Sequence, residues 1–164
     1  MNKTIWFCQV TLTVIVAMCL RIAPWSGSWE LFNPDWVLLT LIYWSIALPE
    51  RVGIFHAWAI GLLTDVLTGQ LFGQHALAYS LVIYACLKLH KRLRQYSFVQ
   101  QGFFIFCGLL LSQLLFFFIK NLRNPAELTA DFWLPVLAGT IFWPLLCVLL
   151  RCFHLSKQTD IEHR

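Results

Sequence analysis

A single carboxylate, Asp65, lies inside an apolar stretch of the chain and has the clearest chemical potential. If this stretch lies in a membrane, a charged side chain there costs about 2.5–3.5 kcal/mol. Asp65 must then pair with a donor, face protein or water, or be protonated. Gly61 precedes it by four residues, so a helix places both on one face, where a glycine lets a second helix approach closely. The pattern favours a polar contact that fixes helix packing or meets a partner. The alternative is a solvated carboxylate at the end of a short helix.

Two further glycines follow Asp65 between this apolar stretch and the next. Gly69 and Gly73 have the G-x-x-x-G spacing that permits close contact between membrane helices. They also lie where the chain must reverse direction, and glycine suits tight turns because it tolerates positive φ. The turn is the favoured interpretation.

The segment Asn33-Pro34-Asp35-Trp36 reads as an extended turn that leads into a helix. Pro34 biases Asn33 away from the helical region, and an aspartate before a helix accepts hydrogen bonds from its first N–H groups. We therefore predict that Asp35 caps a helix beginning at Trp36.

The last apolar stretch contains Trp143 followed by Pro144. A proline inside a helix has no N–H for the carbonyl four residues earlier and tends to kink the helix. Such kinks often shape a groove in membrane proteins.

The most charged segment holds four cations within seven residues: Lys88, Lys91, Arg92 and Arg94. Its simplest interpretation is a cytoplasmic basic loop that anchors the chain and attracts anionic lipid. The alternative is contact with cytoplasmic partners.

Composition excludes several functional classes. The chain is 59% hydrophobic and 12% charged, too apolar to cover a soluble domain, and its cations lie between apolar runs rather than on one solvated face suited to nucleic acid. It carries no G-x-S-x-G, H-E-x-x-H or phosphate-binding glycine loop, no C-x-x-C pair, and its histidines lack ligand spacing. We therefore predict no enzyme, no catalytic or metal-binding residue and no cofactor.

The apolar stretches predict an all-α integral membrane protein of about six transmembrane helices. A single polytopic membrane domain covers residues 1–155, and a polar cytoplasmic tail covers 156–164. The second and third spans are shorter than the roughly 30 Å hydrocarbon core, so they either extend or lie in a thinned or protein-shielded position. The distribution of lysine and arginine between the segments favours a topology with both termini on the cytoplasmic side. The predicted spans are 5–20, 36–48, 54–67, 76–89, 98–119 and 132–150.

Several of these segments, taken in order, resemble the MreD family of bacterial rod shape-determining proteins. The resemblance covers about residues 21–153, and no single motif carries it alone. Its segments are Asn33–Leu39, Ile42-Tyr43-Trp44, Ala47-Leu48-Pro49, Gly61–Asp65 with Gly69 and Gly73, and Trp143-Pro144 before Leu150-Arg151.

The resemblance implies a non-catalytic scaffold in the bacterial cytoplasmic membrane that docks the bitopic protein MreC and helps organise lateral peptidoglycan synthesis and cell shape. It implies a shared complex with MreB, RodZ, RodA and the elongation transpeptidase, and is compatible with homo-oligomers. The implied fold is similar to the S components of energy-coupling-factor transporters. The motif positions of the MreD family correspond to Gly61, Asp65, Gly69 and Gly73 in this sequence, and secondarily to 33–35 and Pro144.

The competing hypothesis is an S-component-like transporter subunit that binds a small molecule. It requires a polar pocket of ligand size. The polar candidates at depth are Asp65, Thr64, Ser112 and Gln113.

Overall fold

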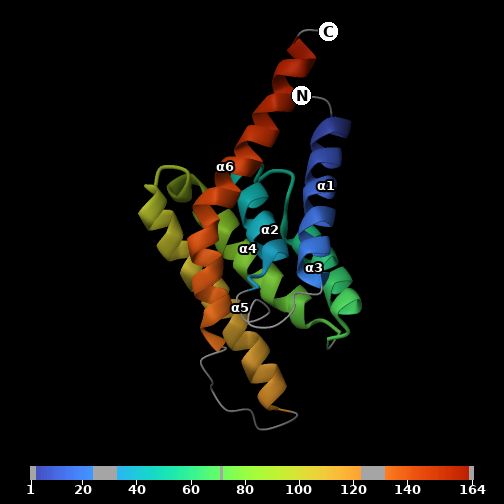
Figure 1. Ribbon diagram of the computed structural model, residues 1–164, viewed down its shortest axis with the longest axis vertical. Coiled ribbons are helices and arrows are strands. Elements are labelled where there is room, and N and C mark those ends of the chain that lie inside the picture. The colour runs from blue at the N-terminus through green and yellow to red at the C-terminus, as the bar shows by residue number, and fades with distance from the viewer. Residues whose placement is uncertain (1–2, 24–32, 71, 123–131, 163–164) are drawn as a thin grey trace.

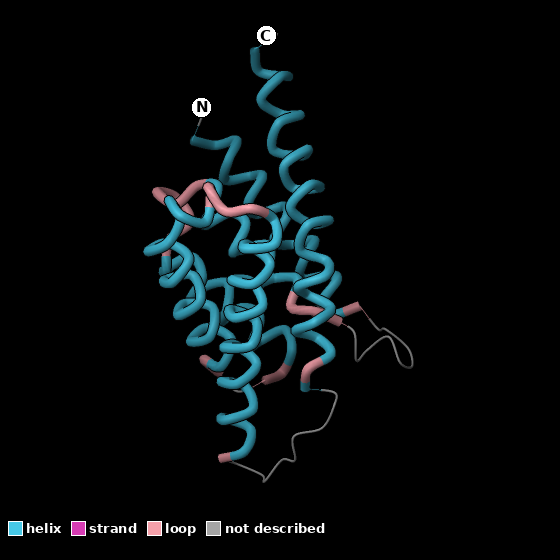
Figure 2. The backbone as a smooth tube through the Cα atoms, turned by 90° about the vertical axis from the view of Figure 1, so that its left-hand side faces the viewer, coloured by secondary structure: helices cyan, strands magenta, loops and turns pink. Residues whose placement is uncertain are grey.

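Helices lie in all six of the apolar stretches identified from the sequence. The computed structural model describes residues 3–23, 33–70, 72–122 and 132–162, and within these residues the fold is all-helical (Figures 1 and 2). The helices are α1 (Lys3–Ile22), α2 (Trp36–Ala47), α3 (Ile54–Thr68), α4 (Gln74–Leu93), α5 (Phe98–Asn121) and α6 (Leu134–Glu162).

Two helices continue well past the predicted apolar limits. Helix α4 ends at Leu93 rather than at residue 89, and α6 continues beyond residue 150 to Glu162. Both extensions lack glycine and proline, the two residues that most strongly disfavour a helix interior. Most of the segment predicted as a polar tail is therefore helical.

Helix α2 is the buried centre of the bundle. Nine consecutive residues, 37–45, are buried, because α2 packs against α1, α4 and α6. A helix that is apolar on every side is buried either in a protein core or in a membrane, and here the neighbouring helices bury it. The Trp44 indole N–H also donates to the Thr13 hydroxyl of α1 at 2.9 Å. The short second stretch is thus shielded by protein.

Helices α3 and α4 form an antiparallel hairpin with the most extensive packing in the bundle. The buried side of α3 carries the small or polar residues Ala57, Gly61, Thr64 and Asp65. Its other side exposes large apolar residues, including Phe55 and Trp58. This division puts the carboxylate against α4 and the apolar side chains outward.

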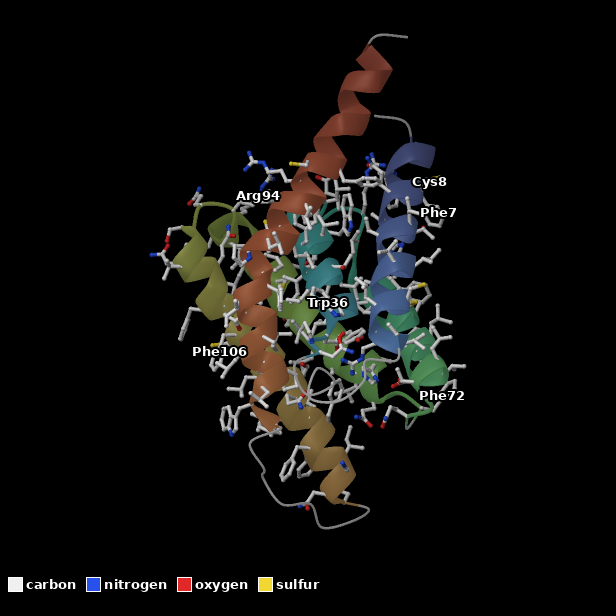
Figure 3. The ribbon with its side chains drawn as sticks, in the orientation of Figure 1. Phe7, Cys8, Trp36, Phe72, Arg94 and Phe106 are labelled. Carbon is white, nitrogen blue, oxygen red and sulfur yellow. The ribbon has the colours of Figure 1, made fainter. Side chains whose placement is uncertain are left out.

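The described part of the bundle has two ends, named here as they stand in Figure 1. The upper end carries the start of α1, the α2–α3 and α4–α5 turns and the end of α6; the lower end carries the α3–α4 turn. Arg94 and Phe72, labelled in Figure 3, mark these two ends.

Among the residues that the structure describes, two segments are long and apolar enough to cross a membrane, Val99–Asn121 and Leu134–Phe153, while 6–22, 36–47 and 54–68 are shorter apolar helices. Large apolar side chains also cover the outside of the bundle, as is expected where lipid replaces water. An all-helical fold with these features is consistent with a membrane protein.

Candidate functional site

Asp65 is fully buried and caps the N-terminus of α4 from the neighbouring helix. Its Oδ2 accepts a hydrogen bond from the Gly73 N–H at 2.9 Å, and its Oδ1 accepts one from the His75 N–H at 2.9 Å. A third N–H, of Ala76, lies 3.5 Å from Oδ2. The first N–H groups of a helix have no partner within the helix and carry partial positive charge, so a carboxylate there is stabilised. The interpretation of Asp65 as a solvated carboxylate is wrong.

His75 completes the surroundings of this carboxylate. Its Nδ1 lies 2.7 Å from Asp65 Oδ1, so the two side chains share one hydrogen. The imidazole packs against Phe116 of α5, with ring centroids 4.5 Å apart, and meets Tyr79 edge-on. Its Nε2 has no hydrogen-bond partner within the described part of the chain.

Gly61 allows the backbone of α4 to approach the carboxylate. A Cβ at this position would lie 2.5 Å from Ala76 Cα, 2.6 Å from Ala76 N and 2.8 Å from the His75 carbonyl carbon. These neighbours are backbone atoms, which cannot move aside as a flexible side chain does. We call Gly61, Asp65, Gly73, His75 and Ala76 the Asp65 cluster.

Gly69 and Gly73 shape the turn between the two helices. Gly69 has φ 63° and ends α3, while Gly73 has φ 96° and precedes α4. Both angles lie in the region that side chains disfavour. A Cβ at either position would meet nothing within 4 Å, so these glycines serve the turn and not a close helix contact.

Asp35 is the second buried carboxylate. As predicted, it caps α2, accepting from the Leu38 N–H at 3.1 Å. The Tyr79 hydroxyl lies 2.8 and 2.9 Å from its two oxygens and so joins α4 to the start of α2. Next to it, the Trp36 indole N–H donates to the Asn33 side-chain oxygen at 2.9 Å, which fixes the turn.

Two α4 side chains that meet the carboxylates, His75 and Tyr79, were not predicted from the sequence. They are four residues apart, so they share one helix face. That spacing of two polar side chains inside an apolar stretch was the available signal.

Trp143 and Pro144 lie away from the carboxylates, beside a groove between α5 and α6. Trp143 is buried. The groove has a volume of about 580 Å³, and its walls include Val99 and Phe103 of α5 and Ile141 of α6, each at least 70% exposed. The remaining lining residues are Gly102, Phe106, Thr140, Trp143 and Pro144.

The four cations lie at the far end of α4 from the Asp65 cluster. All four of Lys88, Lys91, Arg92 and Arg94 are exposed at the upper end, whereas His75 lies in the first turn of α4 at the lower end. Thirteen residues of helix separate His75 from Lys88, or about 20 Å along the axis. The structure therefore brings together Gly61, Asp65 and Gly73, but not these residues with the cations.

Comparison with known proteins assigns the family. The family model described as rod shape-determining protein MreD matches residues 1–153. The rod shape-determining protein MreD of Haemophilus influenzae is 30% identical over 146 residues, which cover 89% of this chain and 90% of that protein. No solved structure matches the chain. The match spans both carboxylates, the α3–α4 turn, the groove and the four cations, and the chain therefore belongs to the MreD family of rod shape-determining proteins.

Proposed function

We propose that the chain is a non-catalytic membrane scaffold of the cell-elongation complex, which docks MreC and helps organise lateral peptidoglycan synthesis. Membership of a rod shape-determining family supports this role. The main structural observation in its support is that both buried carboxylates form hydrogen bonds that hold helices together. Asp65 bonds the backbone of α4, and Asp35 bonds the backbone of α2 and Tyr79, so both serve helix packing. In this proposal MreB, RodZ, RodA and the elongation transpeptidase belong to the same complex.

The competing small-molecule hypothesis requires a polar pocket of roughly 300–1,000 Å³. A polar cavity lined by Arg21, Asp35, Ser112 and Gln113 does exist at the lower end, but its volume is about 20 Å³. That is room for about one water molecule. The size of this cavity favours the scaffold over a vitamin-binding subunit.

We propose six spans in the bacterial cytoplasmic membrane, with both termini in the cytoplasm. The start of α1 and the end of α6 both lie at the upper end of the bundle in Figure 1, as this topology requires. In this topology the segments assigned to the cytoplasm carry nine lysines and arginines, and those assigned to the other side carry three; such residues accumulate on the cytoplasmic side. The nine are Lys3, Arg51, Lys88, Lys91, Arg92, Arg94, Arg151, Lys157 and Arg164, and the three are Arg21, Lys120 and Arg123.

A reporter fused after Arg164 tests this topology. We expect a reporter that works only in the cytoplasm to be active and one that works only in the periplasm to be inactive. The reverse result would overturn the six-span arrangement.

We place the docking of MreC in the groove between α5 and α6. MreC contributes a single membrane helix, and a helix needs a concave apolar surface on its partner to bury its side chains. Gly102 lines the groove, and a Cβ there would meet nothing within 4 Å. Pro144 adds a backbone feature, because it has no N–H to donate to the carbonyl of Thr140, a residue that also lines the groove.

Site-specific photocrosslinking tests this placement. A photoreactive amino acid in place of Phe103 is expected to crosslink to the membrane helix of MreC in native membranes. Phe55 of α3 is a matched control, because it is 73% exposed against 70% for Phe103 and lies on a different face. Crosslinks from position 55 but not from 103 would move the docking site to α3, and crosslinks only to lipid at 103 would show that acyl chains fill the groove.

A further inference from the structure

The last two turns of α4 and its C-cap carry exposed cations that have no acidic partner among the described residues. Lys88, Lys91, Arg92 and Arg94 are all exposed, and none lies within 4.0 Å of a carboxylate among the described residues. Glu50, in the α2–α3 turn, is the acidic residue whose side chain is described at this end of the bundle. Four positive charges on a single short segment therefore face outward uncompensated.

Exposed apolar and aromatic side chains adjoin these cations. Tyr84 is 53% exposed and Leu89 is 36% exposed, both on the same helix, and Tyr96 in the following turn is 39% exposed. The Lys88 ammonium lies 6.0 Å above the Tyr84 ring, one turn back towards the middle of the bundle. A lysine that lies against an apolar wall, beside an exposed tyrosine ring, is typical of the boundary between acyl chains and headgroups.

We infer that these four residues, which we call the basic rim, bind the headgroups of anionic phospholipids in the leaflet at the upper end. The acyl chains of a lipid bound there would lie along the exposed Tyr84 and Leu89, while its phosphate would meet the lysines and arginines. An acidic segment of a soluble protein would satisfy the charges but would leave this apolar wall without a partner. The mixed character of the surface therefore favours a lipid. The inference does not depend on MreC docking, because the basic rim and the groove contain different residues.

Native mass spectrometry of the full chain in mild detergent tests the inference. Phosphatidylglycerol is titrated in parallel with zwitterionic phosphatidylethanolamine, and lipid-bound species are counted. We expect the wild-type chain to bind phosphatidylglycerol more tightly than phosphatidylethanolamine. Each cation near an anionic surface contributes about fivefold to the affinity. The affinity for phosphatidylglycerol should therefore fall more than tenfold in the variant Lys88→Gln/Lys91→Gln/Arg92→Gln/Arg94→Gln. The preference should also weaken as salt rises.

Single substitutions provide a matched control. Lys91 and Lys120 are both exposed lysines at the ends of the bundle, but Lys120 lies at the lower end near the end of α5. Lys91→Gln is expected to weaken phosphatidylglycerol binding, and Lys120→Gln to leave it unchanged. Equal binding of the two lipids to the wild-type chain would overturn the inference, as would an anionic preference that survives the fourfold substitution. Binding of an acidic peptide without any lipid preference would assign the basic rim to a protein partner instead.

Discussion

Replacing Asp65 with asparagine is expected to lower the free energy of unfolding by about 1–3 kcal/mol, the cost of leaving a buried hydrogen-bond donor without its acceptor. Asp65 accepts hydrogen bonds from two N–H groups at the start of α4 at 2.9 Å, and its Oδ1 lies 2.7 Å from His75 Nδ1. An asparagine side chain has only one acceptor oxygen, so its NH₂ group must face one of these donors. The start of α4 would lose its cap, and the α3–α4 hairpin would open first.

The measurement is the thermal unfolding midpoint of purified Asp65→Asn in detergent. Glu50→Gln provides the control, because it removes the same charge from an exposed turn and should change stability by less than about 0.5 kcal/mol. Membrane insertion itself should not suffer, since removing a charge makes insertion easier. If both variants unfold with the wild-type midpoint, the carboxylate does not hold the hairpin together.

Substituting alanine for Gly61 is expected to cost about 3 kcal/mol or more, at the upper end of the range for overpacking. The new methyl group would lie 2.5 Å from Ala76 Cα, so α4 must move away from α3. That movement also pulls the N–H groups of Gly73 and His75 away from Asp65, which adds to the loss.

Gly102→Ala is the matched control for Gly61→Ala. The substitution and the helical setting are the same, but a Cβ at Gly102 would meet nothing within 4 Å. Alanine is favoured over glycine inside a helix by about 0.5–1 kcal/mol, so Gly102→Ala should be neutral or slightly stabilising. Equal midpoints for the two variants in thermal unfolding would show that α3 and α4 are not in close contact at Gly61.

The sequence predicted the helices well because membrane and core helices both require long apolar runs. It also predicted the α2 cap, since an Asn-Pro-Asp segment before an apolar run is a local signal that needs no knowledge of the fold. The sequence left three possibilities open for α2: a longer helix, a thinned membrane around it, or shielding by protein. Hydropathy does not distinguish a helix that faces lipid from one that faces other helices.

The partners of the carboxylates were beyond the reach of sequence patterns. Asp65 binds mainly backbone N–H groups, which every residue other than proline possesses, and they become donors for it only after the turn at Gly69 and Gly73 reverses the chain. The pairing of Asp35 with Tyr79 spans 44 residues and depends on how α2 packs against α4. Three-dimensional packing, and not local spacing, selects these contacts.

The proposed scaffold role connects these local structures to function. The Asp65 cluster and the Asp35–Tyr79 contact fix α4 against α3 and α2, and α4 also packs on α5. Helix α5 forms one wall of the groove in which we place MreC. Stability of the hairpin is therefore expected to influence docking indirectly, whereas substitutions in the groove should affect docking without unfolding the chain.

The most direct test of the scaffold role is co-purification of the tagged chain from its native membranes, with identification of the proteins that accompany it. The scaffold proposal predicts that an MreC protein is recovered in near-stoichiometric amount. Recovery of ATPase and coupling subunits in its place would contradict the proposal and assign the chain to a transport complex.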